Sequence, residues 1–566
     1  MDKPDDAGEA FYKAAWNRSW QGPAYLELAR IAATLKNWHL ALDHCVQSLR
    51  SEPENIGTWC LKALVLRELS RTEEAECCLR HCLSIDPLSP LARYLSDKTS
   101  QFPLQTALDA AHELARAGFF DLALELLNRD PLEWEYGAET IQLYTRAYLH
   151  LRAGRETQAK SEFAVAAAAP ADWCFPSRLE EIQVLQAAIA CGSHDGLARL
   201  LLGQLFYDRK RHLEAAELWE QAALLRPRDS LVWRNLGVAR FNVKGDATGA
   251  CEAYKTARKC NPDDARILYE SDQLAKVMRV SVAERLADLQ RNVHLVARRD
   301  DLSLELAALL NQSGKPEKAL EMMLTRQFQP WEGGEGLILE EFLRAKIISG
   351  ISHLIRGQAN SAVDDFSSTL RPPENLGETW HPLANRSEVY YWLGEAHAAA
   401  ENLADAHKWW TKAAESAGDF QQMAVTPYSE KTLFQILSLQ RLKRLAEAKD
   451  LIEKLRLYAE ELLRHPATID YFATSLPTLL LFNTDLQTAQ ALKARFLMSQ
   501  VHLAAGDIQA AHELAEDILR QNPSHSGAAD MQYILQYNGS APIKSTRRHK
   551  RDTSMALRSE GGSPNE

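Results

Sequence analysis

The feature that most constrains the fold of this chain is an internal repeat near its middle. Residues 197–227 and 228–262 are variants of one pattern. Each contains, in the same order, a Leu-Gly pair, a further small residue, an aromatic residue, an Ala and a closing Pro. These residues are Leu202, Gly203, Ala215, Trp219, Ala222 and Pro227 in the first stretch, and Leu236, Gly237, Ala250, Tyr254, Ala257 and Pro262 in the second. Such self-similarity predicts one supersecondary unit of about 34 residues, repeated along the chain.

The spacing predicts that each unit is a pair of antiparallel helices. Small residues leave room where the two helices approach, the aromatic side chain fills that space, and the proline ends the second helix. One pair cannot bury its apolar face alone, whereas stacked pairs can. The pattern resembles the tetratricopeptide repeat (TPR), and the resemblance implies an all-α superhelix, or α-solenoid. We assign packing roles to Gly203, Ala215, Trp219, Gly237, Gly394 and Ala406.

Composition and charge favour a cytoplasmic helical protein. The chain has 566 residues, of which 46% are hydrophobic and 25% charged, and its formal net charge is −11. An acidic chain of this kind disfavours nonspecific nucleic-acid binding. The first residues form no signal peptide, and no stretch reaches the length of a membrane span. We therefore expect no nucleic-acid or membrane partner.

Nine cysteines do not form a disulfide or metal framework. Cys60, Cys77, Cys78 and Cys82 lie close together in one repeat, but no CxxC pair or nearby His–Cys set accompanies them. We interpret them as small packing residues in a reducing cytosol and expect no metal. The chain contains no phosphate-binding loop, dinucleotide fingerprint, nucleophile elbow or HExxH motif, so we expect no cofactor and no catalytic residues.

The repeats predict about ten to twelve helix pairs in three blocks. Pro53 and Pro87 close two early repeats, and Leu393-Gly394 with Ala406 marks a late one. Two long segments without the pattern, residues 326–336 and 371–386, predict inter-repeat loops. The predicted organisation is a leader or capping segment at 1–21, repeat blocks at 22–178, 179–370 and 371–535, and a disordered polar tail at 536–566.

The two loops and a later helix carry a second, wider resemblance. They are similar to the C-terminal half of large, poorly characterised bacterial and fungal proteins that carry an N-terminal β-sandwich domain of unknown function before a TPR array. We expect no β-sandwich half in the sequence given, and the resemblance implies no functional residues. The residues that carry it are Trp331, Glu332, Gly333, Gly334, Glu335, Gly336, Asn375, Leu376, Gly377, Glu378, His381, Tyr390, Tyr391, Trp392, Leu393 and Gly394.

The two loops are also the best candidates for a ligand or partner site. Carboxylates, an imidazole and an indole suit hydrogen bonding and stacking, and Glu332 with Glu335 could form the carboxylate pair that glycosidases need. The alternative is structural: the glycines turn the chain, and the tryptophan fills a gap between repeats. The candidate residues are Trp331, Glu332, Glu335, Glu378 and His381.

A clamp for the C-terminal tails of chaperones is absent. TPR proteins of that kind carry Lys, Asn and Arg at fixed positions on the first helices of three repeats. In the central array only the Asn matches in kind, and in the first array none does. The residues at these positions are Leu200, Gln204, Asn235, Arg266 and Glu270, and Leu26, Arg30, Leu61, Leu91 and Leu95.

These features predict a non-enzymatic scaffold that binds a protein or peptide in a concave groove, and the negative charge of the chain favours a basic partner. The alternative is an accessory half of a carbohydrate-binding or carbohydrate-active protein. We expect the chain in the cytoplasm, with the basic run at 547–551 offering a nuclear import signal as the alternative.

Overall fold

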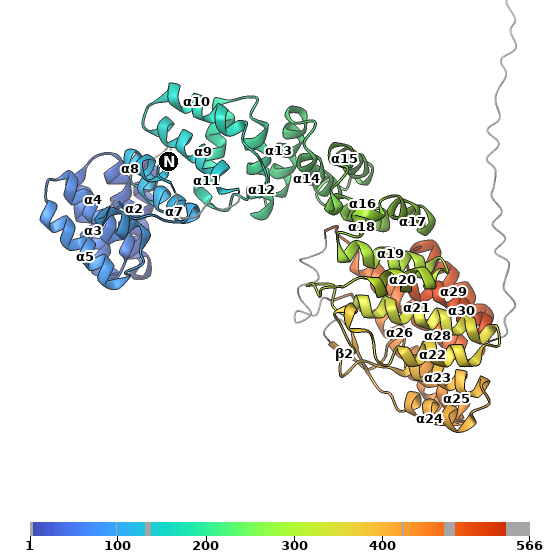
Figure 1. Cartoon of the computed structure of the whole chain (residues 1–566). Coiled ribbons are helices and arrows are strands. Elements are labelled where there is room, and N and C mark those ends of the chain that lie inside the picture. Colours follow the sequence, from blue (N-terminus) through green and yellow to red (C-terminus); the bar gives the residue numbers. More distant parts are fainter. Residues whose placement is uncertain (1–3, 98, 131–136, 422–423, 469–480, 539–566) are drawn as a thin grey trace, which may run out of the picture. The chain divides into compact units, whose positions relative to one another are not determined.

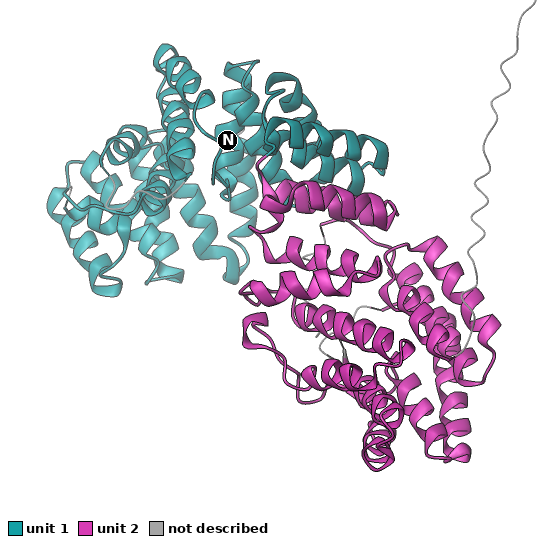
Figure 2. Ribbon diagram, turned by 45° about the vertical axis from the view of Figure 1, so that its right-hand side comes forward, with its two compact units in different colours: residues 1–262 teal, residues 263–566 magenta. Residues whose placement is uncertain are grey.

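The computed structural model describes residues 4–97, 99–130, 137–421, 424–468 and 481–538. Regular structure in these residues is almost entirely helical (Figure 1), and successive helices pack as antiparallel pairs joined by short turns. The prediction of an all-α array of TPR type with two long loops is confirmed. The chain forms two compact units, unit 1 at residues 1–262 and unit 2 at 263–566 (Figure 2). Their boundary lies inside the predicted block at 179–370, and the finer division into blocks stays a prediction.

Unit 1 contains helix pairs together with single helices that pack against them. The pairs are α2 with α3, α4 with α5, α7 with α8, α9 with α10, α12 with α13 and α14 with α15. The bounds are α1 (Pro4–Ala14), α2 (Arg18–Thr34), α3 (Trp38–Ser51), α4 (Ile56–Glu68), α5 (Thr72–Ile85), α6 (Pro90–Ser96), α7 (Leu104–Arg116), α8 (Phe120–Leu127), α9 (Ala138–Arg152), α10 (Glu156–Ala167), α11 (Leu179–Cys191), α12 (Gly196–Asp208), α13 (His212–Leu225), α14 (Ser230–Asn242) and α15 (Ala247–Cys260).

Unit 2 continues with the same motif and ends on a single helix, α30. Its main pairs are α19 with α20, α21 with α22, α23 with α24, α25 with α26 and α28 with α29. The bounds are α16 (Ala265–Val277), α17 (Val282–Arg291), α18 (Val293–Val296), α19 (Asp300–Gln312), α20 (Pro316–Thr325), α21 (Leu337–Ile355), α22 (Ala359–Ser368), η1 (Glu374–Leu376), α23 (Ser387–Ala399), α24 (Leu403–Ala414), β1 (Asp419–Gln421), β2 (Ala424–Thr426), α25 (Thr432–Arg441), α26 (Leu445–Arg464), α28 (Leu486–Ala504), α29 (Ile508–Gln521) and α30 (Ser526–Tyr537).

Side-chain caps fix where the first helix of many pairs begins. The Asp229 carboxylate accepts hydrogen bonds from the backbone N–H groups of Leu231 and Val232, and Asp264 does the same at the start of α16. Each cap satisfies backbone donors that have no partner inside the helix. This explains why an Asp follows the closing proline at a short distance in these repeats.

A residue in the left-handed conformation sits in the tight turn within many of the pairs. Glycine takes this position in several turns, such as Gly154 and Gly506, because it has no Cβ to strain the backbone. In other pairs a polar residue takes it, such as Lys210 at φ 64° and Glu401 at φ 60°. The turns therefore share one backbone conformation although their sequences vary.

The repeat glycines admit an aromatic side chain from the second helix of their own pair. A Cβ added to Gly203 would overlap Trp219, one added to Gly237 would overlap Tyr254, and one added to Gly394 would overlap Trp410. The indole N–H of Trp219 donates to the carbonyl of Leu200 at 3.1 Å. Ala215 and Ala406, from the second helices, are fully buried.

The cysteines of the early repeats lie mainly in this helix packing. All nine are free thiols, and Cys45, Cys60, Cys78, Cys82 and Cys174 are buried. Burial raises the pKa of Cys45 to about 12, so its thiol stays protonated at neutral pH. Among the described residues, no group of three or more His, Cys, Asp or Glu side chains is placed to hold a metal ion.

Among the described residues, a short strand pair falls outside the helical pattern. Strands β1 and β2 form an antiparallel hairpin after α24, with Phe420 opposite Val425. At the other end of the chain, the predicted leader contains α1, which packs on α2, while α2 itself begins inside the leader at Arg18. The leader therefore has helical structure that contacts the first repeat.

Candidate functional site

The two long loops predicted as a candidate site lie side by side in unit 2. The backbone N–H of Phe328 donates to the carbonyl of Asn375 at 2.9 Å. The Asn375 amide in turn donates to the carbonyls of Met323 and Arg326, at 2.8 and 2.7 Å. Phe328 is buried. The loop after α22 therefore closes the C-terminal end of α20, and the two loops form one packed structure.

Glu378 links the second loop to the start of α21. One of its carboxylate oxygens accepts the N–H of Gly336 at 2.8 Å, and the other is buried with no hydrogen-bond partner. Gly377, just before it, has φ 72°, and a Cβ at that position would press on the carbonyl of Phe328. The sequence thus needs glycine there for the close approach of the two loops.

The other acidic candidates face solvent. Glu332 and Glu335 are both exposed, and Glu335 accepts a hydrogen bond from the N–H of Gly333 at 2.8 Å. Trp331 is partly buried against the apolar core around α19 to α21, and its ring covers Gly334. Trp331 therefore fills the space between helices, while the two carboxylates remain accessible.

His381 and Trp380 are both engaged in contacts within unit 2. The exposed His381 ring stacks on Phe420 with ring centroids 3.9 Å apart, and this contact joins the loop to the β1–β2 hairpin. The indole N–H of Trp380 donates to the carbonyl of Thr369 at 2.8 Å, and Arg386 lies over its ring. The aromatic rings of the two loops serve packing, so the carbohydrate-binding alternative has no support from this geometry.

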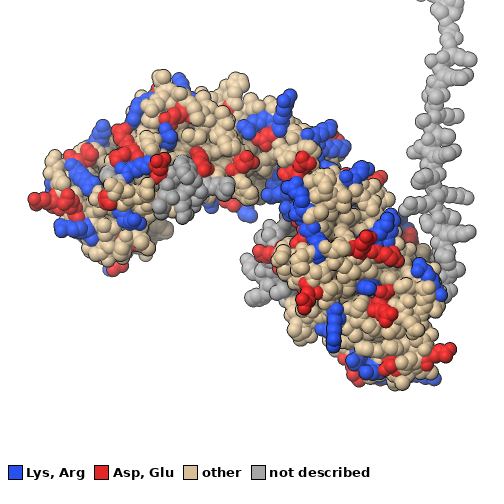
Figure 3. Space-filling view, in the orientation of Figure 1, with Lys and Arg blue, Asp and Glu red and all other residues tan. Residues whose placement is uncertain are grey.

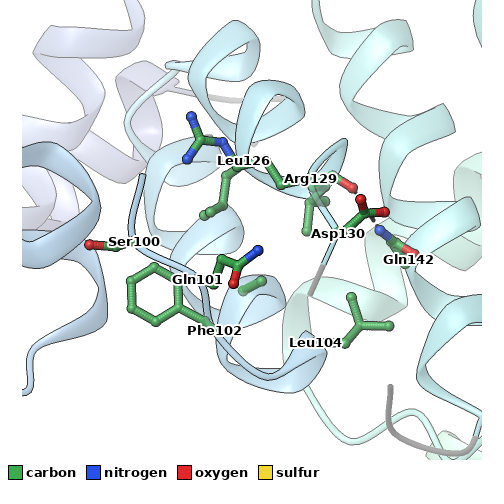
Figure 4. A pocket seen from close by; sticks show the side chains of 10 residues that line it. Ser100, Gln101, Phe102, Leu104, Leu126, Arg129, Asp130 and Gln142 are labelled. Carbon is green, nitrogen blue, oxygen red and sulfur yellow. Dashed lines mark hydrogen bonds between the residues drawn. The ribbon is translucent and has the colours of Figure 1, made fainter. Parts of the chain in front are cut away.

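Two cavities among the described residues lie away from these loops, in unit 1. The first, between α7, α8 and α9, is lined by Phe102, Leu104, Leu126 and Gln142 among others and holds about 10 Å³, room for one water molecule (Figure 4). The second holds about 250 Å³ between α7, α9 and α11. Trp173 and Phe175 on its rim are each 69% exposed.

A different arrangement stands out in unit 2, where the last helix lies against much earlier ones. Helix α30 packs on α29, as a terminal helix of a repeat array would, and also on α19 and α21 (Figure 1). A ring contact and a hydrogen bond join it to α23 as well. Since α19, α21 and α23 are the first helices of three successive pairs, α30 covers what we call the first-helix face of unit 2.

Asp530 fixes the middle of α30 to this face. Its two carboxylate oxygens accept hydrogen bonds from Nε and one terminal nitrogen of Arg344 on α21, at 2.6 and 2.9 Å. Arg344 also contacts Glu341, and both side chains of the Arg344–Asp530 pair are largely enclosed. Burial raises the pKa of Asp530, although Arg344 opposes this shift. A bidentate pair of this kind is directional as well as attractive.

Tyr537 fixes the C-terminal end of α30. Its hydroxyl donates to Glu395 on α23 at 2.9 Å, and its ring meets that of Trp392 edge-on, with centroids 5.3 Å apart. Glu395 is 3% exposed and accepts two further hydrogen bonds from Arg441, at 2.8 and 2.6 Å. The carboxylate is therefore held in place by Arg441 and presents one oxygen to the phenol.

The segment that leads into α30 is also held by side chains. Gln312 at the end of α19 donates to the carbonyl of Pro523 at 2.5 Å, and Arg285 donates to the hydroxyl of Ser524 at 2.9 Å. Arg285 itself is buried and forms a bidentate pair with Asp272. Polar contacts along the whole helix therefore define its register on the face.

These contacts were not predicted from the sequence. The predicted last repeat block extends to residue 535, but its residues after Pro523 were assigned no contact with earlier repeats. A signal is present, since Ala528, Met531, Ile534 and Leu535 recur at helical spacing and are all buried. Their partners on α21 and α23 lie some 140 to 190 positions earlier in the chain, and no local pattern reveals such a pairing.

The surface of the molecule shows charges of both signs. Figure 3 shows Lys and Arg side chains interspersed with Asp and Glu side chains on the face in view. Of the clamp positions in the central array, Leu200 is fully buried and Asn235 is 4% exposed. In the described part of the chain, no helix is long and apolar enough to cross a membrane. The basic run at 547–551 and most of the predicted tail lie outside the described residues.

The solved structures found by comparison resemble this chain only weakly. No family model matches the chain. Similar solved structures are YrrB, described as a TPR protein with an unusual peptide-binding site, the TPR domain of P58(IPK), and the APC/C hetero-tetramer Cut9–Hcn1. Sequence identities are 14%, 14% and 13%, with TM-scores of 0.23, 0.19 and 0.25. The matches cover 41%, 77% and 90% of this chain and 91%, 99% and 96% of the others. With scores this low, the fold assignment rests on the helix pairs themselves.

Proposed function

We propose that this protein is a non-enzymatic scaffold that binds another protein through the first-helix face of its repeats. The observation that carries the proposal is the position of α30, which lies on the first helices of three pairs and is held there by directed polar contacts. A surface that recognises one helix through aligned charges and an aromatic ring has the features of a peptide-binding surface. We place the protein in the cytoplasm.

The exposed carboxylates of the loops supply a second point of contact. Glu332 and Glu335 are accessible, and the chain carries a net charge of −11. Both features favour a basic segment in the partner, because complementary charges steer association and fix its orientation. Trp331, Glu378 and His381 position these loops through their own packing, and the lack of a chaperone-tail clamp argues for a partner of another kind.

The test is affinity capture with quantitative mass spectrometry from cells that contain the protein. The wild-type chain is compared with Tyr537→Ala, which weakens the hold on α30, and with Gln536→Ala, an exposed position on the same helix. We expect one dominant protein partner. Its recovery should rise with Tyr537→Ala, which frees the first-helix face, and should stay the same with Gln536→Ala. Equal recovery from all three chains, or no specific partner, would remove the proposal.

The contribution of the loops is tested separately with Glu332→Gln combined with Glu335→Gln. Removing the two exposed charges should weaken capture of a basic partner and reduce the dependence of capture on salt, since exposed charge pairs are screened. A partner captured equally well, with the same salt dependence, would assign the loops to packing alone.

A further inference from the structure

The contacts of α30 amount to a two-point recognition pattern. Asp530 and Tyr537 are seven residues apart, which places them on one side of the helix about 10 Å from each other. Asp530 meets Arg344 on α21, and Tyr537 meets Glu395 on α23. The carboxylate and the phenol of one helix therefore bind to two different repeats.

Apolar side chains of α30 lie beside and between the two anchors. Ala528, Met531, Ile534 and Leu535 are at most 8% exposed and belong to the core cluster of unit 2. Gln532 and Gln536, on the other side of α30, are exposed. Helix α30 is thus amphipathic, and the face it presents combines an apolar stripe with an acid near its middle and a tyrosine at its C-terminal end.

The receiving side chains are held by their own neighbours. Arg344 also contacts Glu341, and Glu395 accepts hydrogen bonds from Nε and one terminal nitrogen of Arg441. Arg344 and Glu395 are largely buried, so an occupant without matching groups would leave Arg344 without the Asp530 carboxylate and Glu395 without the Tyr537 hydroxyl. Such a penalty against the wrong ligand is a source of specificity.

The position of α30 in the chain also allows it to dissociate from the first-helix face. It is the last helix of the described chain, and the short segment 522–525 alone connects it to α29. Terminal elements open at a lower free-energy cost than elements in the middle of an array. The departure of α30 would uncover the first-helix face without breaking the pairing of any other helices.

From these contacts we infer that the first-helix face of unit 2 binds a partner helix of a defined chemical pattern, and that α30 is the chain's own occupant of that face. The pattern is an acidic residue, a tyrosine seven residues later, and aliphatic side chains one, four and five residues after the acid. The inference rests on the proposed function and adds the class of ligand and the element that competes with it.

The test uses the full chain and a fluorescein-labelled peptide with the sequence of residues 524–538. Fluorescence anisotropy measures binding of the peptide to wild-type chain and to Tyr537→Ala chain. A tethered occupant competes at high effective concentration, so wild-type chain should bind the peptide at least about ten-fold more weakly than the variant. An Asp530→Ala peptide should lose about ten-fold in affinity for the variant chain, and a Gln532→Ala peptide should bind like the parent.

A charge exchange tests the pairing itself. A chain with Arg344→Asp and Tyr537→Ala should prefer a peptide with Asp530→Lys over the parent peptide. Failure of a folded Tyr537→Ala chain to bind the parent peptide more tightly than wild type would overturn the inference. So would a concentration-dependent dimer of wild-type chain that Tyr537→Ala abolishes, since the occupant would then be the α30 of a second copy.

Hydrogen exchange of the wild-type chain keeps the inference testable if the variants do not fold. Amides of α30 should exchange faster than those of α21, and unlabelled peptide should increase the rate in α30 by holding it off the face. Equal protection of α30 and α21, unchanged by peptide, would show α30 to be a fixed part of the core. If a partner is captured as proposed above but the peptide has no effect, the scaffold function stands and the recognition pattern fails.

Discussion

At the scale of single residues, small side chains in this protein act mainly by leaving room for a neighbouring side chain. Gly203, Gly237 and Gly394 each leave room for an aromatic ring of the paired helix, and the alanines beside them are buried completely. Because the interior is close-packed, an added methylene at such a position has to displace a neighbouring helix. The packing assignments made from sequence can therefore be tested one side chain at a time.

Replacing Ala215 by Leu should destabilise unit 1 by about 1–3 kcal/mol, because the larger side chain overpacks the contact between α12 and α13. Chemical denaturation followed by circular dichroism measures the effect. Leu224→Ala on the same helix is the control, since Leu224 is 84% exposed and surface substitutions usually change stability by less than about 0.5 kcal/mol. Equal stability of the Ala215→Leu chain and wild type would place Ala215 outside the tight contact.

His112 should make unit 1 sensitive to acid. Burial, assisted by Arg178 and Arg116 and opposed by Asp109, lowers the pKa of His112 to about 4. Between the unfolded pKa of about 6.5 and this value the unfolded chain binds the extra proton, so stability falls as the pH is lowered. The loss should reach about 3 kcal/mol near pH 4.

The measurement is the urea midpoint of unit 1 between pH 7 and pH 4, compared for wild type, His112→Gln and His39→Gln, where His39 is an exposed histidine. His112→Gln should flatten the pH dependence, and His39→Gln should leave it unchanged. The same slope in all three chains would mean that His112 is not the responsible group.

At the scale of elements, sequence predicted the two long loops but not what joins them. Residues 326–336 and 371–386 stood out because they break the repeat, and their glycines correctly indicated sharp turns. Their mutual hydrogen bonds depend on Asn375 and Glu378 meeting backbone groups some 40 to 50 positions away. Spacing within a repeat carries no information about such contacts. Helix α30 was missed for the same reason, since its partners belong to distant repeats.

Replacing Asn375 by Ala should destabilise unit 2 by about 1–3 kcal/mol, because the carbonyls of Met323 and Arg326 would lose the donor that bridges them. Hydrogen exchange should show faster exchange at the end of α20 and at Phe328. The control is Glu374→Ala, an exposed neighbour in η1. Equal effects of the two substitutions would mean that the Asn375 amide does not join the loops.

At the scale of the whole molecule, repeats contact mainly their sequence neighbours, and the two units have separate cores. The stability of such a chain is a sum over repeats and the interfaces between neighbouring repeats. A destabilising substitution should therefore affect mainly its own unit. Ala215→Leu should accelerate hydrogen exchange in unit 1, and Ala406→Leu should do so in unit 2. Faster exchange spreading through both units from either substitution would show that they unfold as one cooperative body.

The central claim is that this protein binds a partner on the first-helix face of unit 2. Its most direct test is hydrogen exchange of the intact chain with and without a saturating amount of the captured partner. The account predicts slower exchange in α19, α21 and α23 together with faster exchange in α30, which gives up its place on that face. Protection confined to the second helices α20, α22 and α24, with α30 unchanged, would contradict it.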